Sequence, residues 1–226
     1  MTELHDDLHP LDPSEHAAQL AGVLALMPDD ARVVDLGSGV GRIAGPLAGS
    51  GREVLAVDSD PTALRHERWS EQPGIEPLEE DFLSPDATWQ QRGPFDSAVC
   101  LGNTLSLILG HEDLACLFER IATSLDAGGS LLVDDFPIWG WDALHAGDWP
   151  SGVSEDGSAQ IIWCPGDPIF AFRTGSSVDP ESDCLRPGER GLRLWSLSEL
   201  DFLAGQGGLA AAVHHPEQHL LRFDRL

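Results

Sequence analysis

The chain has 226 residues, of which 42% are hydrophobic, so it can build one sizeable core and we expect a single domain over residues 1–226. Its net charge of −25 repels phosphate backbones and anionic lipids, which argues against nucleic acid or a membrane surface as a partner. The four cysteines form no CxxC pair, so neither a zinc site nor a thioredoxin-type redox motif is indicated.

The N-terminal residues, Met1 to Asp7, lack the basic start and apolar core of a secretion signal. No apolar stretch approaches the roughly 18 residues that suggest a membrane span. We therefore expect a cytoplasmic protein.

Short β-rich runs alternate with helical patterns over the first 130 or so residues, after an expected helix at Ser14–Met27. The expected strands are Ala31–Leu36, Glu53–Val57, Ile75–Leu78, Phe95–Leu101 and Ser130–Val133. Most of them are apolar along their whole length, as in a parallel sheet covered by helices on both faces. The pattern predicts a Rossmann-like, doubly wound α/β fold.

Capping signals mark two of the helices that connect these strands. Asp60 and Pro61 predict the start of a helix over Thr62–Glu71. Apolar residues at helical spacing from Leu114 to Leu125 predict a further helix, and Gly128-Gly129 is interpreted as its C-cap.

The C-terminal part contains one more helix and a strand pair. Ser196 and Glu199 have the spacing of a capping box, and Gly207-Gly208 predicts the end of the helix that this box starts. Residues 209–213 and 220–223 are expected to form a final antiparallel pair.

Residues 150–191 interrupt the alternation. Seventeen of these 42 residues are Gly, Pro or Ser, which indicates an insertion rather than another βα unit. Within it, Ile161–Trp163 and Ile169–Arg173 are expected as strands of a flap. The length and position of the insertion suit an active-site lid.

The most informative stretch is Asp35-Leu36-Gly37-Ser38-Gly39-Val40-Gly41-Arg42, which follows an apolar strand. Glycines allow a sharp turn and the close approach of a ligand to bare backbone. A dinucleotide site would place a third glycine at position 42, which is Arg42 here. A pyrophosphate gains nothing from the Asp35 carboxylate, whereas a ligand with an ammonium group does, so the pattern favours an amino-acid moiety.

Acidic residues follow the next two strands. Asp58, after the second strand, can accept hydrogen bonds from both hydroxyls of a ribose. Asp81 can accept one from the exocyclic amine of adenine, and Phe82 can stack on the base, although Asp81 also reads as part of a solvated charge run. The ligand assembled in this way is S-adenosylmethionine (SAM).

These stretches resemble the class I SAM-dependent methyltransferases, closely over residues 14–136 and more loosely over 192–213. The glycine stretch matches the glycine motif of the family, Asp58 its ribose-binding acid and Asp81-Phe82 its adenine motif. The resemblance implies SAM as cofactor and a methyltransferase-type sheet, mostly parallel with an antiparallel last strand. The cofactor contacts that it implies are Asp35, Gly37, Ser38, Gly39, Gly41, Arg42, Asp58, Ser59, Asp81, Phe82, Leu101 and Gly102.

Two further stretches resemble the glycine/sarcosine N-methyltransferase-like enzymes, which act on small amines. They are Leu101–Leu107 and Arg193–Leu200. The resemblance implies methyl transfer to a small-molecule acceptor, in particular an amine. The chain has no tyrosine, so any tyrosine that relatives use is missing.

Acceptor-side candidates lie beyond the strand ends, where ligands of open α/β sheets bind. They are Asn103, Trp139 with Trp141, Arg173 and Arg193. Asn103 reads equally well as a turn residue, the tryptophans as packing and the arginines as partners of the many carboxylates.

Methyl transfer needs no metal and no covalent intermediate, so no catalytic acid, base or metal ligand is assigned. His214–His219 is interpreted as an exposed turn rather than a metal site. The alternative functions are an NAD-dependent oxidoreductase and a non-catalytic SAM-binding domain.

Overall fold

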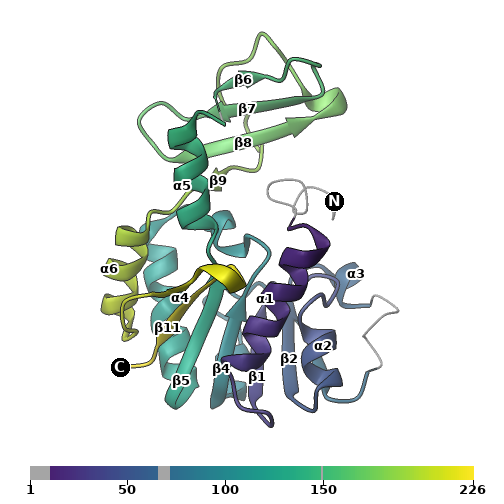
Figure 1. Cartoon of the computed structure of the whole chain (residues 1–226), viewed down its shortest axis with the longest axis vertical. Helices are drawn as coiled ribbons and strands as arrows, with labels where there is room; N and C mark the ends of the chain where they lie inside the picture. The colour runs from purple at the N-terminus through teal and green to yellow at the C-terminus, as the bar shows by residue number, and fades with distance from the viewer. Residues whose placement is uncertain (1–10, 66–71, 149) are drawn as a thin grey trace.

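The structure, a computed structural model of the whole chain, describes residues 11–65, 72–148 and 150–226. Its main body is a seven-stranded sheet of order β10-β11-β5-β4-β1-β2-β3, and a four-stranded sheet stands above it (Figure 1). The main strands are β1 (Arg32–Leu36), β2 (Glu53–Asp58), β3 (Ile75–Glu79), β4 (Phe95–Cys100), β5 (Leu125–Asp134), β10 (Val213–His215) and β11 (Leu220–Asp224). Strands β1 to β5 run parallel, whereas β11 is antiparallel to β5 and β10 to β11. The predicted Rossmann-like sheet is confirmed.

Helices cover both faces of this sheet because its strands are apolar on both sides. Val34 and Leu36 contribute to the core on one face, whereas Val33 contributes to the core on the other. The first face is covered by α4 (His111–Ser124), α6 (Leu197–Gly207) and the 3₁₀ helix η2 (Trp89–Arg92), and the second by α1 (Pro13–Ala25), α2 (Ala44–Gly49) and α3 (Pro61–Leu64). The expected helix before β1 is therefore confirmed.

The predicted caps have different outcomes. Asp60 caps α3 by accepting from the Thr62 N–H at 2.8 Å, but residues 66–71 of the predicted helix lie outside the described residues. The capping box of α6 is confirmed, with Gly208 in the left-handed conformation at its C-terminus.

The interpretation of Gly128-Gly129 as a helix C-cap is wrong. Helix α4 already ends at Ser124, and β5 begins at Leu125. The pairing register of β4 with β5 is irregular here, because Leu125 lies opposite Phe95 whereas Ser130 lies opposite Ser97. The glycine pair therefore lies in a bulge of β5, with Gly128 at φ +86°.

The sequence also gave no indication of α5 (Phe136–Ala146), which follows β5. Apolar residues lie all around this helix, so it lacks the one-sided pattern that identifies a surface helix. Its aromatic side chains belong to a cluster shared with the inserted sheet, which explains the pattern.

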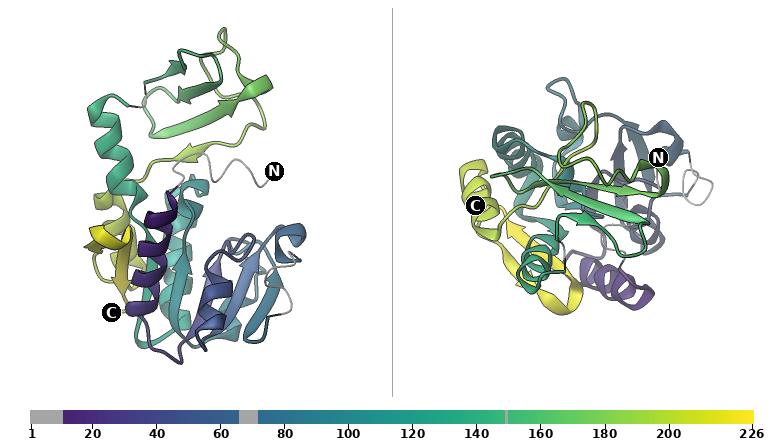
Figure 2. Two further views of the ribbon diagram at one scale, coloured as in Figure 1. Left: turned by 45° about the vertical axis from the view of Figure 1, so that its right-hand side comes forward. Right: turned by 90° about the horizontal axis from the view of Figure 1, so that it is seen from above.

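The inserted sheet is antiparallel and has the order β6-β7-β8-β9. Its strands are β6 (Gly152–Val153), β7 (Ala159–Trp163), β8 (Ile169–Thr174) and β9 (Leu192–Arg193), so the two expected flap strands are confirmed as the paired β7 and β8. The short η4 (Gly175–Ser177) follows β8. Seen from above, this sheet lies over the carboxyl edge of the main sheet (Figure 2).

The last strand pair is shorter than expected at its start. β10 begins at Val213, and Leu209 makes only an isolated bridge to Arg225. The 3₁₀ helix η5 (Pro216–Gln218) connects β10 to β11. None of the helices in the described part of the chain has the length and hydrophobicity needed to span a bilayer.

Candidate active site

The glycine stretch forms a tight loop between β1 and α2. The N–H groups of Gly37 and Ser38 both donate to the Val57 carbonyl, at 2.9 and 3.1 Å. A side chain at Gly37 would place its Cβ 2.7 Å from Thr104 Cγ2, and the residue has φ +74°, so glycine is required there. Gly39, at φ +53°, faces open space instead, since nothing lies within 4 Å of the position of its missing Cβ.

Two polar side chains at this loop each have a buried oxygen that lacks a hydrogen-bond partner among the described residues. Asp35 is 3% exposed, and neither its Oδ2 nor Ser38 Oγ has a hydrogen-bond partner within the described residues. Burial, with a smaller contribution from the Asp58 charge, raises the pKa of Asp35 to about 7, although Arg42 acts in the opposite direction. Such groups are costly to bury unless a ligand completes their hydrogen bonds.

Asp58 lies at the end of β2, next to the glycine loop. Its Oδ2 accepts from the Gly39 N–H and its Oδ1 from the Asp60 N–H, both at 2.8 Å. A carboxylate has about four lone-pair sites, so two remain for a ligand. Ser59 beside it is exposed.

The residues after β3 are held by local contacts. The exposed Asp81 accepts from the Leu83 N–H at 3.0 Å, and the half-buried Phe82 packs against the core. The adjacent Glu80 accepts from the Thr88 and Trp89 N–H groups, at 2.8 and 3.1 Å. Glu80 therefore holds the segment at Thr88 and Trp89 in place, so it is more than a solvated surface charge.

A buried chain of hydrogen bonds connects the glycine loop to the end of β5. The Arg42 guanidinium donates to Gln19 Oε1 at 2.8 Å, and Gln19 Nε2 donates to Asp134 Oδ1 at 3.1 Å. The Asp134 carboxylate also accepts from the N–H groups of Gly102 and Asn103, at 3.2 and 2.8 Å. Gln19 was not among the predicted residues, and a buried amide on an apolar helix face is the only signal that could have found it.

Asn103 is the predicted acceptor-side residue that Asp134 holds in place. It is 7% exposed and has the left-handed conformation at φ +59°, which is rare for residues other than glycine. Leu101, two residues earlier, is buried in the core, and its carbonyl accepts from Thr104 Oγ1 at 2.8 Å. The short η3 (Thr104–Leu107) follows directly.

The two candidate tryptophans lie on α5. Trp139 is stacked near Phe136, with ring centroids 6.0 Å apart, in the aromatic cluster below the inserted sheet. Trp141 donates from its indole N–H to the Trp195 carbonyl at 3.0 Å, so it connects α5 to the segment before α6.

Both candidate arginines have carboxylate partners. The buried Arg173 donates from Nη2 to Glu189 Oε2 at 2.7 Å, within the inserted segment. Arg193 donates to Glu199 at 3.1 Å and to Asp167 at 3.3 Å, and it lies 4.4 Å from the Trp195 ring centroid. These pairings correspond to the alternative reading of the two arginines.

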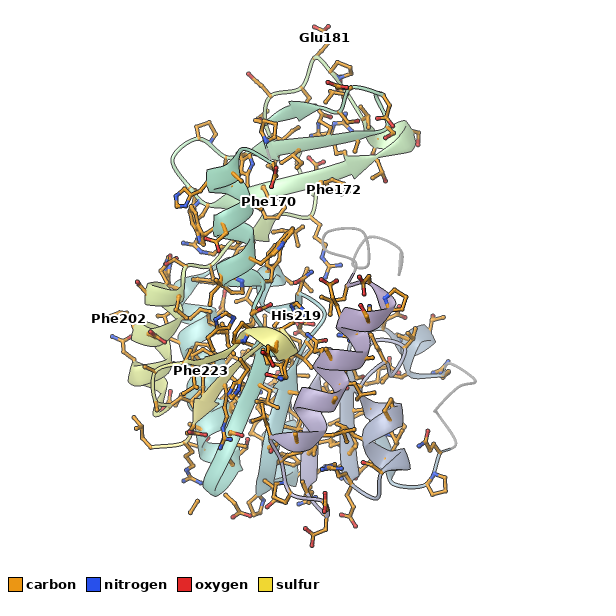
Figure 3. All side chains as sticks on the ribbon, in the orientation of Figure 1. Phe170, Phe172, Glu181, Phe202, His219 and Phe223 are labelled. Carbon is orange, nitrogen blue, oxygen red and sulfur yellow. The ribbon has the colours of Figure 1, made fainter. Side chains whose placement is uncertain are left out.

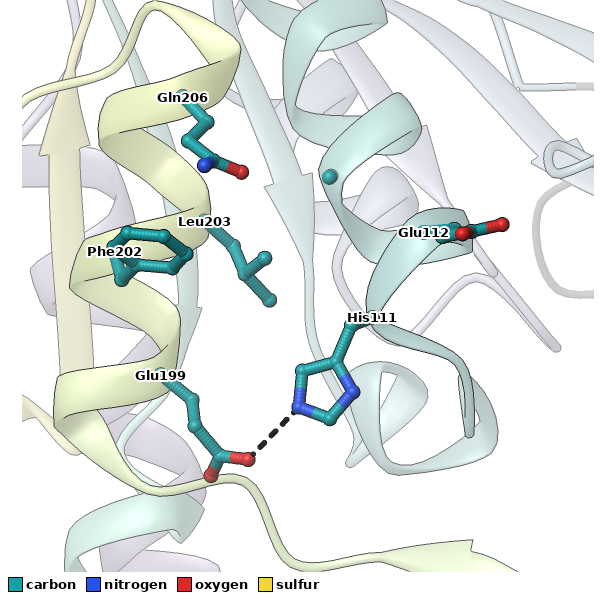
Figure 4. Close-up of a pocket in the computed structure, with 7 residues that line it drawn as sticks. His111, Glu112, Glu199, Phe202, Leu203 and Gln206 are labelled. Carbon is teal, nitrogen blue, oxygen red and sulfur yellow. Dashed lines mark hydrogen bonds and ion pairs between the residues drawn. The ribbon is translucent and has the colours of Figure 1, made fainter.

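A separate hollow of about 470 Å³ lies between α4 and α6 (Figure 4). Its lining residues are His111, Glu112, Ala115, Glu199, Phe202, Leu203 and Gln206, none of which was predicted as a site residue. Over the residues that the structure describes, no group of three or more His, Cys, Asp or Glu side chains is arranged to hold a metal ion.

Comparison with known proteins identifies part of the chain directly. Residues 33–129, which contain the glycine loop, Asp58 and Asn103, match the family model described as a methyltransferase domain. No curated protein sequence matches the chain.

Many solved structures share the fold. The CcbJ methyltransferase of Streptomyces caelestis is 19% identical, with a TM-score of 0.66 over 95% of this chain and 96% of that one. A SAM-dependent methyltransferase from Clostridium acetobutylicum is 14% identical, with a TM-score of 0.67 over 98% and 96%. A SAM-bound amino pentose methyltransferase from Micromonospora echinaspora is 17% identical, with a TM-score of 0.57 over 94% and 90%.

These findings give no support to an NAD-dependent oxidoreductase or to a non-catalytic SAM-binding domain. The position where a dinucleotide site needs glycine is held by Arg42, whose guanidinium is part of the buried chain to Gln19. Residues 33–129 match a methyltransferase domain, the whole chain shares its fold with solved SAM-dependent methyltransferases, and the protein is an enzyme with SAM as its cofactor.

Proposed function

We propose that the enzyme transfers the methyl group of SAM to the nitrogen of a small-molecule amine. The observation that carries this proposal is the charge at the carboxyl end of β5, where Asp134 and Asp135 adjoin Asn103 and α5. Carboxylates attract an ammonium group, whereas Arg173 and Arg193, which suit an acidic acceptor, are already paired. The likeness to an amino pentose methyltransferase is consistent with an amine.

The proposed cofactor contacts follow from the loop geometry. The unpartnered Asp35 Oδ2 and Ser38 Oγ suit the amino-acid end of SAM, which lies over the backbone of Gly37, Gly39 and Gly41. When bound, SAM supplies an electrophilic methyl group. The remaining proposed contacts are Asp58 and Ser59 to the ribose, Asp81 and Phe82 to the adenine, and Arg42, Leu101 and Gly102 around the reacting end.

In this proposal the protein acts mainly by orientation and by excluding water. Holding a nucleophile in line with the reacting carbon can lower a barrier by about 7–11 kcal/mol. Asn103, with its buried amide at the end of β4, and Trp139 are the proposed acceptor contacts.

We further propose that the inserted segment, residues 150–191, is a lid over the site. Burial lowers the pKa of Arg190, and the charge of Asp58 raises it. Arg190, which lies just before β9, is therefore within electrostatic reach of the ribose-side carboxylate. A cover in this place would exclude water during transfer.

Calorimetry and an acceptor panel test this proposal. We expect S-adenosylhomocysteine (SAH) to bind the wild type, and Asp35→Asn to weaken that binding by about tenfold or more, because a charged hydrogen bond is lost. Methylation of amines, with no methylation of carboxylic acids or phenols, supports the acceptor class. Absence of SAH binding at millimolar ligand contradicts the cofactor site, and methylation of acids or phenols alone contradicts the amine.

A further inference from the structure

A carboxylate between two histidines lies at the same sheet edge as Asn103. His214 Nε2 lies 3.1 Å from Asp135 Oδ2, and His219 Nδ1 lies 3.9 Å from Asp135 Oδ1. We refer to these three residues as the His–Asp–His cluster. Asp135 and the histidines are visible in the sequence, but nothing in it indicated that His214, 79 residues after Asp135, lies next to it in the fold.

The strand register places this cluster at the carboxyl edge of the sheet. Asp134, the last residue of β5, pairs with Leu220, the first residue of β11, and Leu220 pairs with His215, the last residue of β10. Figure 3 shows His219 at the upper end of β11, beside α1 and below the inserted sheet. The cluster is therefore at the edge where the parallel strands present their ligand-binding ends.

Hydrogen bonds connect the cluster to the proposed acceptor site. The His219 carbonyl accepts from the Asp135 N–H at 3.3 Å and from Gln19 Nε2 at 3.2 Å. The same Gln19 amide donates to Asp134, which holds the Asn103 N–H. His219 has the left-handed conformation at φ +53°, so the turn keeps a costly backbone geometry to make these contacts.

The exposure of the side chains suits proton transfer. Asp135 is 11% exposed, whereas His214 is 32% and His219 is 26% exposed. An ionised carboxylate can only accept hydrogen bonds, so His214 carries its hydrogen on Nε2 and leaves the Nδ1 lone pair available.

An amine acceptor requires such a group. Simple alkyl amines, like the lysine side chain with its pKa of about 10.4, are protonated at neutral pH and have no lone pair for attack. We propose that His214, supported by Asp135 and His219, removes this proton from the acceptor. The N–H bond of the ammonium breaks, its electron pair stays on nitrogen, and the proton bonds to His214 Nδ1 before it leaves to solvent.

This inference rests on the proposed amine acceptor and adds a catalytic base to it. The other titratable side chains on the elements packed around the cluster are Glu15 and His16 on α1, Asp126 and Asp134 on β5, Asp142 and His145 on α5, His215 on β10, Glu217 on η5, and Arg222 and Asp224 on β11. Arg222 donates to Asp224 at 2.7 Å, so this pair is internally compensated.

The test compares His214→Asn with His145→Asn, a change of an exposed histidine near the end of α5. The probe is phenethylamine, with SAM saturating. At pH 7 we expect His214→Asn to lower the rate by about 100-fold or more, the usual effect of a lost general base, and His145→Asn to leave it unchanged. At pH 10 the free amine is abundant, so the deficit of His214→Asn should shrink at least tenfold.

A second readout does not depend on turnover. In SAH-saturated wild type, added phenethylamine should shift the imidazole ¹⁵N resonances of His214 and His219 but not that of His145. A wild-type rate in His214→Asn at pH 7, an equal deficit at pH 7 and pH 10, or unmoved resonances would each overturn the inference. If the wild type binds SAH but methylates no amine, the proposed acceptor class fails as well, so the two failures are distinguishable.

Discussion

The cofactor side and the acceptor side of this sheet edge use buried carboxylates in opposite ways. Asp35, near the end of β1, has one oxygen without a hydrogen-bond partner in the described part of the chain. Asp134, at the end of β5, accepts from two backbone N–H groups and from the Gln19 amide. Burial raises the pKa of both. At Asp134 the largest opposing contribution is a backbone hydrogen bond, whereas at Asp35 it is the charge of Arg42. The Asp134 hydrogen bonds therefore hold its charge in a fixed place, whereas the open oxygen of Asp35 is the one that we propose contacts the cofactor.

Among the changes that distinguish the two sides, we expect Asp35→Asn to have the largest effect on the free energy of unfolding, measured without ligand. The pKa of Asp35 is 3.8 in the unfolded chain and about 7 in the folded protein. Between these values the folded state keeps a proton that the unfolded chain has lost, so the wild type loses stability as the pH rises from 4 to 7. Asparagine cannot ionise, and at about 1.4 kcal/mol per unit the variant should gain up to about 4 kcal/mol over the wild type at pH 7.

Urea denaturation at pH 4, 5.5 and 7 measures this difference. Asp81→Asn is the control, because Asp81 is exposed and should show no such trend. A stability difference between Asp35→Asn and the wild type that stays constant with pH would contradict the assignment of Asp35 as an uncompensated buried acid.

The next largest effect is expected from Gly37→Ala, compared with Gly39→Ala in the same loop. Both residues have positive φ, which costs about 1–2 kcal/mol for alanine. Only Gly37 also meets Thr104, and overpacking adds about 1–3 kcal/mol. We expect denaturation to show a loss of about 3 kcal/mol for Gly37→Ala and about 1 kcal/mol for Gly39→Ala.

The order of the two variants in SAH affinity should differ from their order in stability. The Gly39 Cβ would enter the open space assigned to SAM, so calorimetry should show weaker SAH binding in Gly39→Ala despite its smaller stability loss. Equal SAH affinity of Gly39→Ala and the wild type would remove the ligand from this part of the loop.

The smallest effect is expected from Gln19→Ala, which breaks the connection between the two sides. Gln19 is 1% exposed and bonds to Arg42, Asp134 and the His219 carbonyl. Its removal should lower the free energy of unfolding by about 1–2 kcal/mol, since buried groups lose partners. Gln206→Ala, at an exposed position of α6, should change it by less than about 0.5 kcal/mol. Equal losses of stability in Gln19→Ala and Gln206→Ala would show that the Arg42–Gln19–Asp134 hydrogen bonds do not couple the glycine loop to the end of β5.

The local geometry of the glycine loop and of the acidic residues beside it was largely predictable because its signals are local. Gly37, Asp58 and Asp60 act through backbone within a few residues or on the adjacent strand, and turns and caps have known residue preferences. The mostly parallel sheet followed from the βαβ alternation, and the capping box of α6 lies within four consecutive residues.

The acceptor side was less predictable because its contacts join distant parts of the chain. Gln19 meets Asp134 across 115 positions, and His214 meets Asp135 across 79. Helix α5 had no amphipathic pattern, since it packs on two sides. Pairing of Arg173 and Arg193 with carboxylates was foreseen, but that the partners are Glu189 and Glu199 depends on the fold.

As part of the proposed cofactor site, the open oxygen of Asp35 would couple the binding of SAM to acidity. An ammonium group placed beside this carboxylate favours its ionised form, so a carboxyl group that is partly protonated near pH 7 gives up its proton as the ligand enters. The apparent affinity for SAM would then weaken as the pH falls. Asp35 on β1 would in this way set the pH range over which the enzyme binds its cofactor.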